Sequence, residues 1–208
     1  YKAFSTVNTL TGGGDNGPAY NVSSTWNGCI EERSTVAASS FSYSTLTGMT
    51  PSGALDLDID TPPGGNDATK WAPMWPELAY NRSSSTDGWK VSSSCPHSAQ
   101  LLSEMTESQF DAYADSLSPQ GNTYLDLGMI WGGRISSPTG IFEANVNEAP
   151  SNGGEVSRHI IFMTDGYMQP NNSIQTTYGI ERLDQRVTDD GSSSHASRHT
   201  SRFLAVCQ

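Results

Sequence analysis

The stretch RHIIFMTDG, residues 158–166, determines the fold that we predict for this chain. Ile160–Met163 are four consecutive apolar residues, and the sequence becomes polar at once at Thr164-Asp165-Gly166. An apolar run without alternation is typical of a strand buried on both faces, in a parallel sheet covered by helices. Ligands of such sheets lie outside the carboxyl ends of the strands, where Gly166 permits a sharp turn. We therefore expect Asp165 at the functional edge of an α/β fold.

Segments with helical periodicity accompany this expected strand, as an α/β fold requires. Thr106 and Gln109 form a capping-box pattern at the start of one such segment, which ends near Leu117. A second segment, 121–136, places one set of apolar residues on a single helical face: Leu127, Ile130, Trp131 and Ile135. Residues 193–208 begin a last helix, and residues 99–102 are compatible with a short strand.

The sequence divides into two parts near residue 97. Residues 1–97 are rich in turn residues, with short β-like runs at 24–31 and 34–38, which indicates a loop-rich, partly β lobe. We interpret its tryptophans as a small core beneath long loops. Residues 98–208 carry the alternating helix and strand patterns, and we expect them to form an incomplete α/β core.

The composition excludes several classes of function. The 208 residues carry a formal net charge of −11, so phosphate backbones and anionic membrane surfaces would be repelled, whereas cations would be attracted. The sequence has no apolar run of 18 residues, so nothing in it is expected to span a bilayer. Because the chain begins in mid-pattern at Tyr1, we interpret it as a piece of a longer or processed protein.

Three cysteines stand at 29, 95 and 207 in a chain with few lysines and many Ser, Thr, Asn and Trp residues. This composition suggests an extracytoplasmic protein, in which Cys29 and Cys95 would form a disulfide and Cys207 would remain without a partner. The alternative is three free, buried thiols. No Cys/His cluster has the spacing of a zinc site.

Thr123 and Asp165 are the candidate metal ligands. Thr123 follows a Pro-x-Gly-Asn turn and opens a predicted helix, so its hydroxyl could lie near the Asp165 carboxylate. Such an oxygen-only pair suits Mg²⁺ or Ca²⁺. The alternatives are a helix N-cap at Thr123 and a loop-capping role for Asp165.

Two other sets of polar residues are weaker candidates for a metal or catalytic site. His195 and His199 are four residues apart, a spacing that suits a transition metal or a catalytic pair, but we favour a solvated helix face. Asp56, Asp58 and Asp60 alternate but lack the glycine and glutamate of an EF-hand, so we favour a solvated acidic turn over a calcium site.

Several longer segments resemble one family. IIFMTDG resembles the fourth strand of von Willebrand factor type A domains, and Gly121-Asn122-Thr123 resembles their metal-contacting threonine turn. The resemblance is closest to TadG-like proteins of Tad (Flp) pilus assembly, and five segments carry it: WNGCIEER (26–33), DLDID (56–60), NTYLDLGMIWGGRISSPTGIF (122–142), SRHIIFMTDG (157–166) and YGIERLDQRV (178–187). It implies a von Willebrand factor A-like (Rossmann-like) parallel sheet flanked by helices, with residues 1–97 as a loop-rich, partly β insertion.

The family's Asp-x-Ser-x-Ser metal motif does not occur in residues 1–208. The resemblance implies that the motif lies upstream, beyond a membrane anchor, and that the chain is truncated at both ends and retains only Thr123 and Asp165 of the metal site. A Mg²⁺, Ca²⁺ or Mn²⁺ ion could therefore be bound weakly, or be absent.

The resemblance implies a non-enzymatic adhesion module anchored to the bacterial envelope, with pilus or envelope proteins as partners. The alternatives are a structural envelope domain with a non-functional metal site, and a secreted metal-dependent hydrolase that uses Asp165, His195 and His199.

Overall fold

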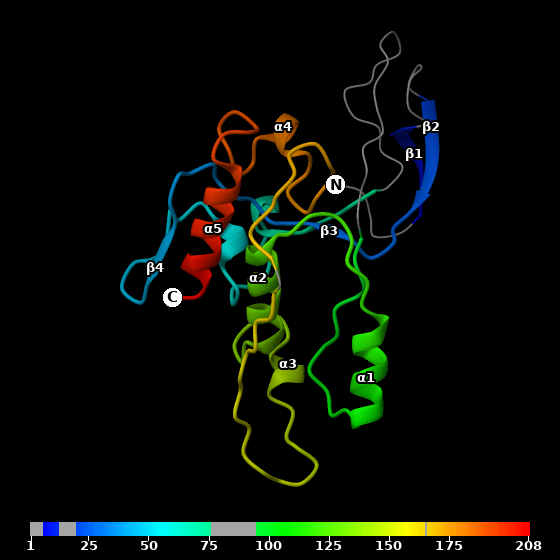
Figure 1. Cartoon of the computed structure of the whole chain (residues 1–208), viewed down its shortest axis with the longest axis vertical. Coiled ribbons are helices and arrows are strands. Elements are labelled where there is room, and N and C mark those ends of the chain that lie inside the picture. Colours follow the sequence, from blue (N-terminus) through cyan, green and yellow to red (C-terminus); the bar gives the residue numbers. More distant parts are fainter. Residues whose placement is uncertain (1–5, 13–19, 76–94, 165) are drawn as a thin grey trace.

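The computed structural model describes residues 6–12, 20–75, 95–164 and 166–208, which form a mixed α/β arrangement (Figure 1). The helical elements are η1 (Leu55–Leu57), η2 (Asp67–Thr69), α1 (Glu107–Ser116), α2 (Leu125–Ser136), α3 (Glu143–Val146), α4 (Glu181–Asp184) and α5 (His195–Val206). The strands are β1 (Thr6–Gly12), β2 (Tyr20–Thr25), β3 (Ile30–Glu31), β4 (Ser42–Ser44), β5 (Gly48–Thr50) and β6 (Ala72–Pro73).

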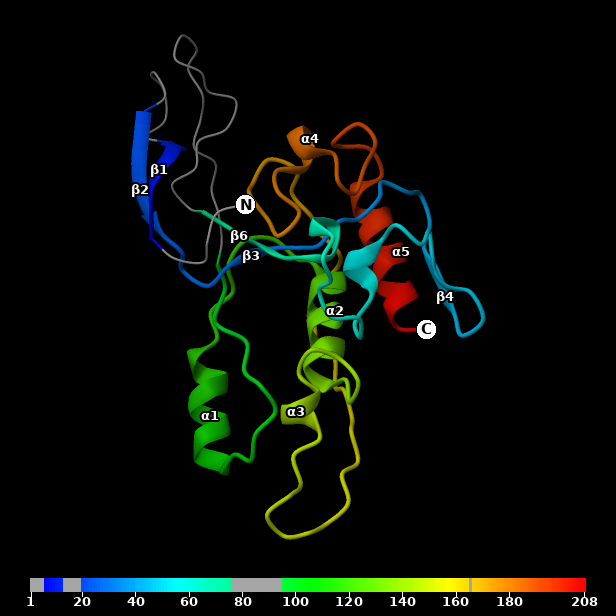
Figure 2. The same cartoon turned by 180° about the vertical axis from the view of Figure 1, so that it is seen from behind.

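Helices α2 and α5 pack against each other at the centre of the molecule (Figures 1 and 2). Ile130 of α2 and Ala205 of α5 are buried there against three residues of the N-terminal half, which are Phe41, Ala54 and Leu57. The sequence predicted α2 from its apolar periodicity and a helix start at 193–208 for α5, and the structure has both helices. The core therefore joins two helices of the C-terminal half to loops from the N-terminal half.

Helix α1 begins as its sequence predicts but does not enter this core. The Thr106 hydroxyl accepts the Gln109 backbone N–H, and the Gln109 side chain accepts the Thr106 N–H, so the capping box is formed. The apolar face of α1 is exposed: Phe110 retains 60% and Leu117 51% of their accessible surface. Figure 2 shows α1 beside α3, away from the α2–α5 pair. Local signals were sufficient for this helix to form.

The strands pair only in twos, and every pair is antiparallel: β1 with β2, β3 with β6, and β4 with β5. The predicted β-like run 24–31 is partly strand, whereas 34–38 and 99–102 are not. Within the described ranges there is no parallel sheet, so the expectation of an α/β chain is confirmed only at the level of mixed α and β structure. The domain boundary near residue 97 stays a prediction.

The apolar segment 158–164, expected to be a strand buried on both faces, is neither paired nor buried in the structure. Ile160, Ile161 and Met163 keep 52%, 83% and 85% of their accessible surface. Phe162 alone points inward, packing on Phe203 of α5 with ring centroids 5.2 Å apart. Burial on both faces needs neighbouring strands and a layer on each side, and the described residues provide a layer on one side only.

Replacing Ile161 with Asn discriminates between the two descriptions of this segment. Because Ile161 is exposed, the change is expected to alter the free energy of unfolding by less than about 0.5 kcal/mol. In a doubly buried strand it would leave an unpaired amide and cost several kcal/mol, roughly 2 to 5. Urea unfolding followed by tryptophan fluorescence measures the difference. Ile130→Asn, in the buried face of α2, is the matched control and should be strongly destabilising.

Candidate functional site

A chain of buried polar side chains connects α2 to α5. Asp126, the second residue of α2, accepts a hydrogen bond from Nδ1 of His199, with 2.7 Å between the two atoms. Nε2 of His199 lies 3.2 Å from Nε2 of His195, one helical turn earlier on α5. Asp126 and His199 are fully buried, whereas His195 is partly exposed. The prediction of a solvated histidine face was therefore wrong for His199, because its carboxylate partner is 73 residues away in the sequence.

Arg202, one turn after His199, binds a second buried carboxylate. It forms an ion pair with Asp56 and donates from Nε to Asp126 Oδ2 at 3.2 Å. Tyr178 donates its hydroxyl to Asp56 at 2.9 Å and accepts from Arg202 at 2.7 Å. The solvated acidic turn predicted for the DLDID segment is thus wrong for Asp56, which is fully buried. Its cationic partner comes from α5, so no local pattern revealed the pair.

These contacts shift the pKa values of the cluster. Burial by itself raises the pKa of Asp126, but His199 and Arg202 outweigh burial and bring it below its ordinary value. Burial also lowers the pKa of Arg202, yet Asp56, Tyr178 and Asp126 raise it well above the ordinary value. His195 has no carboxylate in contact, so burial and the neighbouring His199 lower its pKa to about 4. At neutral pH the cluster therefore holds an ionised Asp126, a charged Arg202 and an uncharged His195.

A second buried ion pair lies further along α2 and adjoins the first cluster, since Arg134 also donates to the Asp56 carbonyl. Arg134 donates to Glu32 Oε1 at 2.7 Å, and Trp71 donates its indole N–H to Glu32 Oε2 at 3.0 Å. The guanidinium groups of Arg33 and Arg134 lie 4.5 and 5.1 Å from the Trp71 ring centroid. Sequence reasoning assigned Trp71 to a small core but missed this charged stack, because Glu32 and Arg134 are 102 residues apart.

Thr123 lies immediately before α2, next to the loop that follows the 158–164 segment. Its backbone exchanges hydrogen bonds with Gln169, N–H to carbonyl, at 3.2 and 3.0 Å. A Cβ placed on Gly166 would lie 4.0 Å from the Thr123 hydroxyl, so this hydroxyl faces the residue that follows Asp165. Asp165 itself lies outside the described residues, and the predicted Thr123–Asp165 pair remains a prediction. The predicted N-cap role of Thr123 is not observed, since α2 has Tyr124 at its N-cap.

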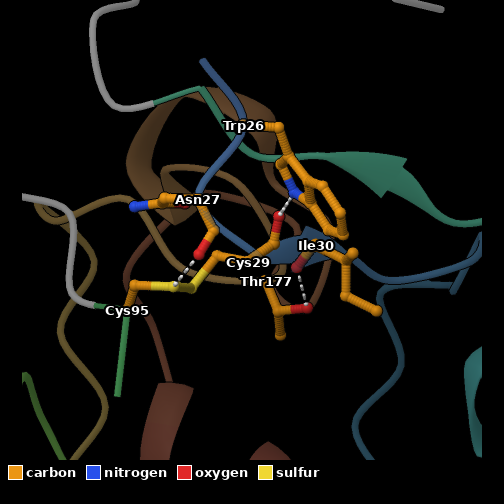
Figure 3. The surroundings of a disulfide bond; sticks show 6 residues. All are labelled: Trp26, Asn27, Cys29, Ile30, Cys95 and Thr177. Atoms are coloured by element: carbon orange, nitrogen blue, oxygen red, sulfur yellow. Dashed lines mark hydrogen bonds between the residues drawn. A yellow bond between two sulfur atoms is a disulfide. The ribbon is translucent and has the colours of Figure 1, made fainter. Parts of the chain in front are cut away.

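Cys29 and Cys95 are joined by a disulfide, the pairing expected from the sequence, and Cys207 is a free, exposed thiol. Figure 3 shows the surroundings of this bond. The Trp26 indole N–H donates to the Cys29 carbonyl, and the Thr177 hydroxyl donates to the Ile30 carbonyl at 2.8 Å. The disulfide therefore ties Cys95 to the residue before β3, and the Thr177 hydrogen bond holds the loop before α4 to the same strand.

A cavity of about 650 Å³ lies beside this disulfide, a volume within the range of small-ligand sites. The apolar part of its wall comes from Ile30, Met74, Leu127, Trp131 and Ile174. Gly121 and Asn122 also line the cavity, which places its edge next to Thr123. The cavity could thus accept an apolar group of a partner or ligand whose polar end reaches Thr123.

In the described parts of the chain, no group of three or more His, Cys, Asp or Glu side chains is arranged to hold a metal ion. The described helices are also too short or too polar to cross a membrane. Comparisons of the chain with protein-family models, with curated proteins and with solved structures find no match. The geometry of the side chains therefore carries the functional argument.

Proposed function

We propose that this chain is part of a non-enzymatic interaction module of the bacterial envelope, of the TadG-like, von Willebrand factor A type. Thr123 and Asp165 would contribute oxygen ligands to a divalent cation at its binding edge. The observation that carries the proposal is the position of the Thr123 hydroxyl, which faces Gly166 and has no hydrogen-bond partner among the described residues. A hydroxyl without a hydrogen-bond partner in the described ranges, next to a residue that adjoins a carboxylate, fits a hard cation such as Mg²⁺.

The connection between Thr123 and the Asp165 loop is supported on both sides of the loop. Before it, Phe162 contacts Phe203, and a Cβ on Gly128 would lie 3.3 Å from the Phe162 ring. After it, the Tyr124 hydroxyl donates to the Asn171 carbonyl at 3.1 Å and accepts the Asn171 N–H at 2.9 Å. The chain therefore passes over α2 and α5 immediately before and after Asp165. The proposed family fold would place a strand and a ligand-binding loop in this position.

Other features support the proposed location and partner. A disulfide is typical of an oxidising compartment, which supports an extracytoplasmic site. An ion that leaves one coordination position open would accept an acidic side chain from a pilus or envelope protein. The cavity next to Thr123 would take an adjacent apolar side chain of the same partner. Two neighbouring contacts of different chemistry would provide specificity.

Titration with Mg²⁺, measured by isothermal calorimetry, tests the proposed ion. We expect a Kd of about 0.1 to 1 mM, the range of weak extracellular sites, since the chain lacks the Asp-x-Ser-x-Ser motif. Asp165→Asn should abolish the heat of binding, and Thr123→Val should weaken binding at least about tenfold. Thr47→Val, which removes an exposed hydroxyl elsewhere, is the matched control and should bind as the parent does.

Unchanged binding in Thr123→Val would contradict the proposed ligand set. The absence of any heat with Mg²⁺ would favour the alternative of a structural envelope domain with a non-functional metal site. The hydrolase alternative requires Asp165 to act with His195 and His199. It is tested by turnover of ester and phosphoester substrates, and no turnover at any metal concentration would exclude it.

A further inference from the structure

His195 and His199 are arranged as a pair of imidazole ligands. Both lie on one face of α5, and their Nε2 atoms are 3.2 Å apart. Two nitrogen atoms bound to one tetrahedral Zn²⁺ at 2.0 to 2.1 Å are separated by about 3.3 to 3.4 Å. The observed separation is therefore close to that of two ligands of a single ion.

The tautomer of His199 is set by its other ring nitrogen. Nδ1 lies 2.7 Å from the buried Asp126 carboxylate. An ionised carboxylate has no proton to donate, so it accepts the hydrogen bond and the histidine donates it. When Nδ1 carries the ring proton and donates it to this carboxylate, the lone pair of Nε2 faces His195. A carboxylate that orients a histidine in this way is the usual outer partner of a metal-bound imidazole.

The charge around the pair also favours a cation. Asp56 and Asp126 are both fully buried and share one positive partner, Arg202, while Tyr178 is uncharged. Glu181 is a further buried carboxylate of this region, with both oxygens accepting hydrogen bonds from Val187 and Thr188. A metal ion next to His199 would lie close to these carboxylates, and the partly exposed His195 gives it access from solvent.

We propose that His195 and His199 bind a transition-metal ion, Zn²⁺ being the expected species, with Asp126 positioning His199 from behind. The two remaining coordination positions would be open to water or to a ligand from a partner. This site is independent of the proposed Thr123–Asp165 site, because imidazole selects Zn²⁺, Ni²⁺ and Cu²⁺, whereas the oxygen ligands select Mg²⁺ and Ca²⁺. The alternative is an N–H···N hydrogen bond between the two rings, with no ion.

The experiment is a competition titration of Zn²⁺ against a chromophoric chelator, carried out in a Cys207→Ser background because the exposed thiol would bind the same metals. We expect one Zn²⁺ per chain. His195→Gln should weaken binding at least about tenfold, and because His195 is partly exposed at the start of α5, this variant should remain folded. His159→Gln removes an exposed histidine outside the pair and is the matched control, with unchanged affinity.

A second readout identifies the ligand atoms. In ¹⁵N-edited spectra of the histidine rings, Zn²⁺ should shift Nε2 of His195 and His199 and leave His97 and His159 unchanged. Absence of binding up to about 1 mM Zn²⁺, or an affinity that His195→Gln leaves unaltered, would overturn the proposal in favour of the hydrogen-bonded pair. Since Mg²⁺ binding is measured separately, failure at one site does not affect the test of the other.

Discussion

Replacing Arg202 with Met is expected to lower the free energy of unfolding by about 3 to 5 kcal/mol, the usual cost of removing one partner from a buried ion pair. Arg202 is fully buried and provides positive charge to both Asp56 and Asp126. Methionine fills much of the same space but leaves two buried carboxylates without a cation. Urea unfolding followed by tryptophan fluorescence measures the loss.

Two further variants separate charge from packing at this position. Adding Asp56→Asn and Asp126→Asn to Arg202→Met removes the unpaired charges, so part of the lost stability should return. Arg158→Met removes an arginine from the exposed 158–164 segment and should cost less than about 1 kcal/mol. If Arg202→Met costs no more than Arg158→Met, the buried cluster does not stabilise the fold in the way described.

Removing the disulfide is expected to have the second large effect. Cys29 and Cys95 are 66 residues apart in the sequence, and closing a loop of that length restricts the unfolded chain by about 4 kcal/mol in the loop-entropy treatment. The double variant Cys29→Ala, Cys95→Ala should therefore lose about 2 to 4 kcal/mol, since measured values are commonly below that limit. Thermal and urea unfolding of the oxidised protein and the variant give the difference.

Cys207 provides the internal control for this measurement. Its thiol is free and exposed, so Cys207→Ala should change stability by less than about 0.5 kcal/mol. A reducing agent should lower the stability of the parent protein to that of the double variant and leave the double variant unchanged. Equal stability of the oxidised and reduced parent would show that the 29–95 bond does not constrain the unfolded chain.

Helices α1 and α2 could be predicted from the sequence because the features that form them lie within a few residues of one another. The capping box at Thr106 and Gln109 and the apolar periodicity of 125–136 act within a few residues, and both helices form as predicted. The sequence predicted the candidate metal site only in part. The sequence named Thr123, and the structure adds that its hydroxyl faces Gly166. Its pairing with Asp165 stays a prediction.

The sequence by itself predicted helices α1, α2 and α5, the choice of cysteines for the disulfide, and an acidic charge that disfavours nucleic-acid partners. Only the tertiary structure decided what happens to 158–164, because a strand exists only when other chain segments offer it hydrogen bonds on its edges. The same holds for Asp56 and His199, whose partners Arg202 and Asp126 are 146 and 73 residues away. Burial of a charge depends on a distant partner, and no local pattern encodes that distance.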